Sequence, residues 1–245
     1  MSRMIEHSAL PDEVHAPLAA DFAGASCIDR DLPSRKAGNA VRLIAAVAAR
    51  GYLATYHRLQ IVGRQNLPAS GPFVIVSNHA SHIDALCLRA ALPLRRLSDA
   101  FTAVAEDYFL ANPLRRTSAR VFANAVPFSR QVRVRGGMRR VRSLLDDDNA
   151  TLIFFPEGTR TRNGSVGAFR PGVGALLAGS SLPVVPCAIQ GAFEAWPKGT
   201  RWAWPRPIRV VIGQSRHYGA LPRSRQSHRL VADDLHTAVE ELLCT

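Results

Sequence analysis

Short, continuous apolar runs are the feature that most constrains the fold of this 245-residue chain. The runs "PFVIV" and "TLIFF" are each followed by polar residues, and Pro156 stops the second run. Runs of this length without polar alternation are typical of strands that are buried on both faces. Apolar residues at helical spacing lie between such runs, and strands that alternate with helices indicate an α/β fold. We therefore expect a single layered domain with a mixed, largely parallel sheet flanked by helices.

The expected elements follow one another along most of the chain. Strands are expected within residues 57–68, 71–78, 124–131, 151–161, 182–191 and 208–214, with a further apolar stretch at 101–110. Helices are expected from residue 37 onward and within residues 81–92, 132–148, 172–181 and 228–243. Residues 1–35 contain several prolines and no sustained period, so they are expected to form a loosely ordered arm. The folded domain is expected to span residues 36–245.

An apolar helix is expected at the start of the folded domain. In "AVRLIAAVAARGYLATY" the apolar residues recur at helical spacing and the charges are all basic. Such a helix is either part of a core or lies on a membrane surface. Arg42 and Arg50 argue against a membrane span, because an arginine at the bilayer centre costs at least about 2.5 kcal/mol. A second uncharged stretch, residues 171–193, holds Pro183 and Pro186 and is expected to form a short helix, a turn and a strand.

The charge balance of the chain favours anionic partners. Lysine and arginine outnumber aspartate and glutamate by 31 to 19, which gives a net charge of +12. This surplus suits nucleic acid, an anionic membrane surface or a phosphorylated substrate, although a solvated arginine-rich surface explains it equally well. The chain shows no helix-turn-helix signature, zinc finger or aromatic RNA-binding motif, so no nucleic-acid partner is expected. The four cysteines form no CxxC pair and no signal peptide is visible, so the expected location is cytoplasmic.

The segment "VSNHASHIDALCL" places two histidines and an aspartate just after the first buried run. In open α/β sheets, ligands bind beyond the carboxyl ends of the strands, so His79 is placed for chemistry. A step of five residues falls about 140° off one helix face, so we expect His79 on a loop and Asp84 in the first helical turns. A carboxylate on Nδ1 fixes the tautomer and raises the basicity of Nε2. His79 is therefore a candidate general base for a hydroxyl group.

Other interpretations of this segment stay open. His79 and Asp84 also fit a plain helix-capping pair, and His82 is a rival base. Ser81 lacks the GxSxG context of a serine nucleophile. The HxxHxD spacing hints at a metal, but no further cluster of histidines or carboxylates supports one, so no metal site is expected.

The segment "FFPEGTRTR" repeats the pattern of polar residues at the end of a strand. Gly158 allows a tight turn and a close approach of the backbone to a ligand. Arg160 suits bidentate binding of a phosphate or carboxylate, although a structural pair with Glu157 explains both residues equally well. Backbone N–H groups near Gly158 are candidates to stabilise an oxyanion.

Together, the two segments resemble the lysophospholipid, or glycerolipid, acyltransferase family. Four blocks occur in the order of the family: "NHASHID", "AVPFSRQ", "FFPEGTR" and "LPVVPCAI". The resemblance implies transfer of a fatty acyl group from an acyl-CoA or acyl-carrier-protein thioester to a lysophospholipid hydroxyl, with no covalent enzyme intermediate and no cofactor. It implies that His79 is the base and that Asp84 orients it. It gives head-group binding to residues of the second and third blocks: Phe128, Arg130, Glu157, Gly158, Thr159 and Arg160.

Two departures from the family pattern bear on the acceptor. Phe128 stands two residues before Arg130, whereas the phenylalanine of the family usually stands three before. Glu106 takes the place of a lysine that helps to hold phosphate in the family, and a carboxylate repels phosphate. The acceptor is therefore either lysophosphatidic acid-like, with Arg115 or Arg116 supplying the charge, or another lipid or metabolite alcohol.

A basic stretch favours an anionic membrane as a partner. Nine arginines and no acid lie between Arg115 and Arg142. Anionic lipid head groups attract such a stretch by about 1 kcal/mol per charge, and an acidic carrier protein would be attracted as well. With the apolar helix, this predicts a peripheral enzyme on the inner face of the membrane.

Overall fold

The computed structural model describes residues 35–105, 117, 121–128 and 141–245. The expected N-terminal arm lies almost entirely outside the described residues, so its loose order and its boundary with the folded domain stay predictions. Within the described part, everything from Asn39 to Thr245 belongs to one compact unit.

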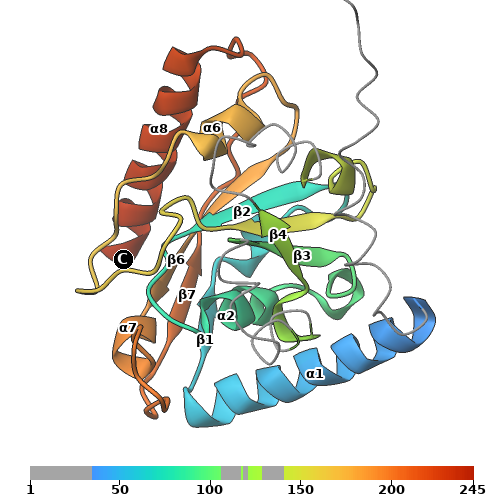
Figure 1. Cartoon of the computed structure of the whole chain (residues 1–245), viewed down its shortest axis with the longest axis vertical. Coiled ribbons are helices and arrows are strands. Elements are labelled where there is room, and N and C mark those ends of the chain that lie inside the picture. Colours follow the sequence, from blue (N-terminus) through green and yellow to red (C-terminus); the bar gives the residue numbers. More distant parts are fainter. Residues whose placement is uncertain (1–34, 106–116, 118–120, 129–140) are drawn as a thin grey trace, which may run out of the picture. The chain divides into compact units, whose positions relative to one another are not determined.

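A seven-stranded sheet runs through this unit (Figure 1). In chain order the strands are β1 (Gln60–Val62), β2 (Phe73–Ser77), β3 (Ala100–Ala105), β4 (Ala125–Phe128), β5 (Thr151–Phe154), β6 (Val184–Gln190) and β7 (Arg209–Ile212). Their order across the sheet is β1-β7-β6-β2-β5-β3-β4. All neighbouring pairs are parallel except β6 and β7. The expectation of a mixed, largely parallel sheet is confirmed.

Helices cover both faces of the sheet (Figure 1). They are α1 (Arg35–Tyr56), α2 (Asp84–Ala91), α6 (Gly172–Leu177), α7 (Ala192–Ala195) and α8 (Arg225–Leu243), with short 3-10 turns η2 (Arg64–Asn66) and η3 (Leu94–Arg96). Helices α6 and α8 pack on one face. Helix α2 and the inner side of α1 pack on the opposite face. The result is a three-layer α/β arrangement, as the alternation of apolar patterns predicts.

Strand β2 shows why its sequence is apolar at every position. Phe73 and Ile75 belong to the core under α1 and α2, whereas Val74 and Val76 belong to the core under α6 and α8. All four are at most 1% exposed. Burying an aliphatic or aromatic side chain contributes roughly 1.5–3 kcal/mol, so both faces of this strand stabilise the layers.

The structure corrects several expected boundaries. The segment expected to be helical at 81–92 becomes helical only at Asp84, and α7 is an element that the sequence patterns do not predict. Of the basic helix expected at 132–148, residues 132–140 lie outside the described part and residues 141–144 are helical. Among the described helices, none is long and apolar enough to cross a membrane.

Candidate active site

The candidate site lies at the carboxyl ends of two neighbouring parallel strands. Strand β2 ends at Ser77, two residues before His79, and β5 ends at Phe154, three residues before Glu157. The two strands pair in parallel, so their carboxyl ends share one edge of the sheet. This pairing brings together the first and third sequence blocks, which are more than 70 residues apart in the chain.

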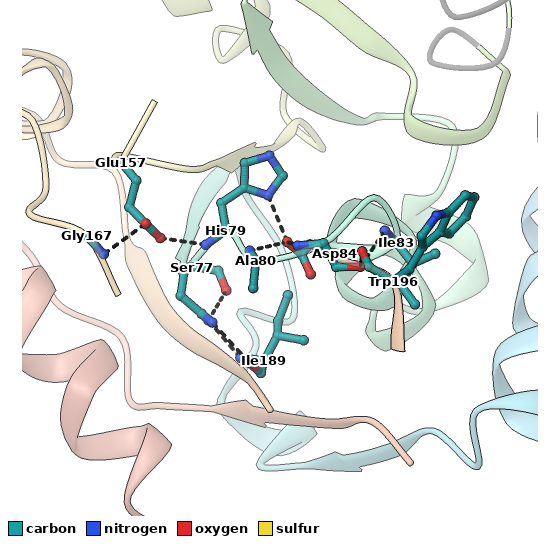
Figure 2. A network of polar contacts seen from close by, with 11 residues as sticks. Ser77, His79, Ala80, Ile83, Asp84, Glu157, Gly167, Ile189 and Trp196 are labelled. Carbon is teal, nitrogen blue, oxygen red and sulfur yellow. Dashed lines mark hydrogen bonds and ion pairs between the residues drawn. The ribbon is translucent and has the colours of Figure 1, made fainter. Parts of the chain in front are cut away.

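Asp84 holds the loop that carries His79. Its Oδ2 accepts hydrogen bonds from His79 Nδ1 at 2.8 Å and from the N–H groups of Ala80 and Ser81, each at 2.7 Å. The Asp84 side chain is fully buried, while that of His79 is 24% exposed. Figure 2 shows one ring nitrogen of His79 directed to Asp84 and the other directed away from it. The expected arrangement, with His79 on a loop and Asp84 at the helix start, is confirmed.

The third sequence block holds His79 from the other side. The Phe155 ring stacks on the imidazole, with centroids 4.2 Å apart and planes 18° apart. Glu157 Oε1 accepts the backbone N–H of His79 at 2.6 Å (Figure 2). Thr161 N–H donates to the carbonyl of His79 at 2.9 Å. Both main-chain groups and the ring of His79 are therefore fixed before any ligand binds.

Asn78 is a site residue that the sequence reasoning missed. Its side-chain oxygen accepts the N–H of Ile189 at 2.9 Å, and its amide donates to the carbonyl of Ile189 at 3.0 Å. Ser77 Oγ also donates to the Asn78 oxygen. These hydrogen bonds connect the end of β2 to β6 and so help to fix the position of the adjacent His79. The only signal in the sequence is that Asn78 directly precedes His79.

Glu157 has the contacts of a positioning residue. The resemblance to the family gives it a role in head-group binding, which stays a prediction. In the structure Glu157 Oε2 accepts the N–H of Gly167 at 2.9 Å, and Oε1 accepts the N–H of His79. Both carboxylate oxygens therefore accept backbone N–H groups. A Cβ at Gly167 would lie 2.9 Å from Glu157 Oε2, so a larger residue there would displace the carboxylate. Burial raises the pKa of Glu157 to about 7, because it outweighs the effect of the two N–H donors.

Replacing Glu157 with glutamine is expected to remove a pH dependence of stability. Folded Glu157 keeps its proton to about pH 7, whereas the unfolded carboxyl loses it near pH 4.5. Wild-type stability should therefore fall between these values as the pH rises, by at most about 3 kcal/mol. Urea unfolding of both proteins at pH 5 and pH 8 measures this, since groups far from position 157 titrate alike in the two chains. Equal pH dependence in both would contradict it.

The turn after Glu157 needs glycine at position 158. Gly158 has a φ of +71°, and a Cβ there would lie 3.0 Å from Arg170 Nε. Arg170 Nε donates to the Glu157 carbonyl at 3.2 Å, which packs the arginine against the turn. The N–H of Gly158 itself donates to Phe155 O at 3.1 Å. This N–H is therefore already bonded within the turn, and an oxyanion-stabilising role for the other backbone N–H groups near Gly158 stays a prediction.

A basic cleft of about 610 Å³ lies beside this turn. Its lining includes four cationic side chains, Arg160, Arg162, Arg170 and Lys198. Lys198 Nζ lies 3.4 Å from Thr159 Oγ1. Among the described residues of the lining, Glu157 is the one carboxylate, and its oxygens accept backbone N–H groups. The cleft adjoins His79 through Glu157, and its charge suits a phosphate-bearing ligand.

The rival residues near His79 have other contacts. Ser81 Oγ donates to the carbonyl of Trp196 at 2.7 Å and is fully buried, which is the environment of a structural hydroxyl. The His82 ring packs against Trp196, with centroids 5.1 Å apart. His79 is bonded to the buried carboxylate of Asp84, which favours it as the base. Among the described residues no cluster of three or more His, Cys, Asp or Glu side chains is arranged to hold a metal ion.

Several predicted site residues follow the neighbouring strands. Phe128 is the last residue of β4, which pairs in parallel with β3. Arg130 follows β4 and Glu106 follows β3 in the chain, but both lie outside the described residues, as do Arg115 and Arg116. The roles expected for these residues therefore stay predictions.

Comparison with known proteins identifies the family of the chain. The family model described as acyltransferase matches residues 58–190 of the chain. A 1-acyl-sn-glycerol-3-phosphate acyltransferase of Limnanthes douglasii is 33% identical over 143 residues, which cover 56% of this chain and 47% of the relative. A protein of the same name from Pseudomonas aeruginosa is 43% identical over 68 residues, 28% of this chain and 26% of the relative.

A solved structure shares the fold. The crystal structure of the 1-acyl-sn-glycerophosphate acyltransferase of Thermotoga maritima matches with a TM-score of 0.61 and 22% sequence identity. The match covers 85% of this chain and 80% of that one. The chain spans about half the length of the plant relative named above.

Proposed function

The chain belongs to the acyltransferase family, and on that premise we propose that it transfers a fatty acyl group from a thioester to the hydroxyl group of a lysophospholipid. The observation that carries the proposal is the His79–Asp84 pair, which stands beside a basic cleft and is held by the third block. The donor is acyl-CoA or an acyl-carrier protein, and the acceptor is lysophosphatidic acid-like.

His79 is the general base in the proposed reaction. Because Nδ1 is hydrogen-bonded to Asp84, Nε2 is the nitrogen left for the acceptor hydroxyl. Nε2 takes the hydroxyl proton while the oxygen attacks the thioester carbonyl carbon and forms the new C–O bond. The C–S bond of the resulting tetrahedral intermediate then breaks, and His79 returns the proton to the leaving thiolate. The enzyme ends unchanged, and the products are an ester and a free thiol.

The basic cleft supports an acceptor that carries a phosphate. Glu106 stands where the family has a phosphate-holding lysine, so another cation must supply the charge if the acceptor is lysophosphatidic acid. Arg160, Arg162 and Lys198 line the cleft and offer that charge at the carboxyl end of the sheet. Charge-assisted hydrogen bonds from arginine to phosphate are often bidentate and are roughly twice as strong as neutral ones.

Product formation with a panel of acceptors tests the proposal. Purified protein is incubated with a long-chain acyl-CoA or acyl-carrier protein and with lysophosphatidic acid, lysophosphatidylcholine or a long-chain alcohol, and thiol release and the acylated product are measured. Fastest turnover of lysophosphatidic acid is expected. Preference for lysophosphatidylcholine or for the alcohol would refute the lysophosphatidic acid-like acceptor but keep the acyltransferase. No acceptor-dependent thiol release with either donor would refute the proposed activity.

Replacing Arg160 with alanine is expected to raise the KM for a phosphate-bearing acceptor by about 10- to 100-fold, because a hydrogen bond to a charged group contributes roughly 1.5–3 kcal/mol. Steady-state kinetics with lysophosphatidic acid measure this effect. Arg229→Ala is the matched control, since Arg229 is an exposed arginine of α8 outside the cleft. A KM that stays at the wild-type value in Arg160→Ala would contradict the role of this residue.

A further inference from the structure

A short loop carries all the tryptophans of the chain. The three tryptophans in the sequence are Trp196, Trp202 and Trp204, and they lie between α7 and β7, in residues 196–208, here called the tryptophan loop. Trp202 is 71% exposed and Trp204 is 63% exposed. Large aromatic side chains usually bury most of their surface, so two neighbouring tryptophans in solvent indicate a surface that meets a partner.

The tryptophan loop is held in a defined conformation. The N–H of Trp204 donates to the carbonyl of Ala195 at 2.7 Å. Trp196 Nε1 donates to the carbonyl of Thr200 at 3.2 Å, and Thr200 Oγ1 donates to the carbonyl of Pro197 at 2.9 Å. These bonds fix the loop, so Trp202 and Trp204 are presented to the outside.

The tryptophan loop joins the end of α1. Tyr56 Oη donates to the carbonyl of Ala203 at 3.0 Å, and His57 Nδ1 is hydrogen-bonded to the carbonyl of Arg206 at 3.1 Å. The N–H of Ile208 donates to the carbonyl of His57 at 3.0 Å. In Figure 1 the end of α1 lies near the loop that follows α7. The surface of the loop therefore continues onto the helix.

The outer face of α1 is apolar. From Ala40 to Tyr56, none of the described exposed residues is charged. Arg42 and Arg50 are half-buried, and the Arg50 guanidinium donates to the carbonyl of Leu92 in the body of the protein. The large side chains that face outward are Val41, Leu43, Ile44, Val47, Tyr52 and Tyr56, each at least 38% exposed. An amphipathic helix normally points its charged residues toward solvent, whereas this helix presents apolar residues to solvent.

The charge around the aromatic residues is positive. The loop sequence holds Lys198, Arg201 and Arg206 and no acid. The Arg201 guanidinium lies 5.5 Å from the centre of the Trp202 ring. Tryptophan and tyrosine concentrate at the head-group level of membranes, and each nearby cation adds about 1 kcal/mol of attraction to anionic lipid. A second copy of the chain is a poorer partner, because a two-fold interface would face these cations with the same cations.

We propose that the tryptophan loop and the outer face of α1 form one docking surface for an anionic lipid bilayer. Trp202 and Trp204 enter the head-group region, and the exposed side chains of α1 lie against the acyl boundary. The same loop reaches the candidate site, because the carbonyl of Trp196 accepts Ser81 Oγ and Lys198 lines the basic cleft. Docking would hold the cleft at the surface where a lysolipid diffuses, a benefit that rests on the proposed acyl transfer.

Native fluorescence tests the docking surface without a label, because every tryptophan of the chain lies in the loop. The full chain is titrated with vesicles of phosphatidylglycerol or phosphatidylcholine, with and without brominated acyl chains. A blue shift and quenching by bromine are expected with the anionic vesicles. Trp202→Ser/Trp204→Ser should bind these vesicles about tenfold more weakly in co-sedimentation, since partial burial of two aromatic side chains is lost.

Controls separate the outcomes. Leu230→Ser changes an exposed apolar residue of α8 and should bind vesicles as the wild type does. The double variant should turn over a short-chain, dispersed lysolipid at the wild-type rate, which shows that it is folded. An unchanged wild-type emission on vesicles, unchanged binding by the double variant, or a blue shift that depends on protein concentration without lipid would overturn the proposal. Fluorescence requires no turnover, so failure of the proposed enzyme activity would be seen separately.

Discussion

Replacing His79 with alanine is expected to lower acceptor-dependent thiol release by about 10²- to 10⁴-fold, the usual contribution of a general base. The expectation rests on the hydrogen bond between His79 Nδ1 and Asp84, which leaves Nε2 for the hydroxyl of the acceptor. The loss should appear in kcat. The KM for the acceptor should change little, because the proposed head-group contacts come from Arg160 and its neighbours in the cleft. Initial rates over a range of acceptor concentrations separate the two parameters.

His82→Ala is the matched control for this experiment. It removes the other histidine of the same segment, whose ring packs against Trp196 and has no described contact with Asp84. It should keep activity within a few-fold of the wild type. A loss in His82→Ala with activity kept in His79→Ala would assign the base to His82. Activity kept in both variants would refute a histidine base.

The fold of His79→Ala should be checked beside its activity. The substitution removes the stacking on Phe155 and one of the three donors to Asp84 Oδ2, but Ala80 and Ser81 still donate to that oxygen. We expect a destabilisation of about 1–2 kcal/mol, which thermal unfolding followed by circular dichroism would register. A folded protein without activity is the result that supports the base.

The layered fold could be predicted from the sequence because its cause is local. In β2, β5 and β6, neighbouring residues point to opposite cores, so each run is apolar throughout and short. The order of strands across the sheet has no such local cause. β6 lies next to β2 although more than 100 residues separate them, and no pattern within either strand records this pairing.

The candidate site likewise has features that follow from neighbouring residues in the sequence and features that do not. The relation of His79 to Asp84 follows from five residues of sequence, and helix geometry alone predicts a loop histidine with a helix aspartate. Glu157 and Asn78 act through partners far along the chain, the N–H of His79 and the backbone of Ile189. Such contacts depend on which strands are neighbours, so sequence reasoning assigned Glu157 to the substrate and left Asn78 without a role.

Replacing Asp84 with asparagine should separate orientation of His79 from folding of its loop. Asparagine keeps the shape of the side chain, and its oxygen can still accept the N–H groups of Ala80 and Ser81. It lacks the charge that stabilises the imidazolium formed when His79 takes a proton. Its amide would also place N–H donors where Asp84 Oδ1 is buried without a hydrogen-bond partner among the described residues. We expect kcat to fall by about 10²- to 10⁴-fold and stability by about 1–3 kcal/mol.

Comparing the change in kcat with the change in KM shows whether Asp84 acts through His79. Asp84 is fully buried, so it cannot contact the acceptor, and the KM should stay within a few-fold of the wild type. Asp234→Asn is the matched control. It makes the same chemical change on α8, where the partners of the carboxylate are Arg216 and Tyr218. Full activity in Asp234→Asn with a loss of kcat in Asp84→Asn is the expected pair of results. A kcat within threefold of the wild type in folded Asp84→Asn would mean that hydrogen bonding alone orients His79, and that the buried charge serves the loop and not the proton transfer.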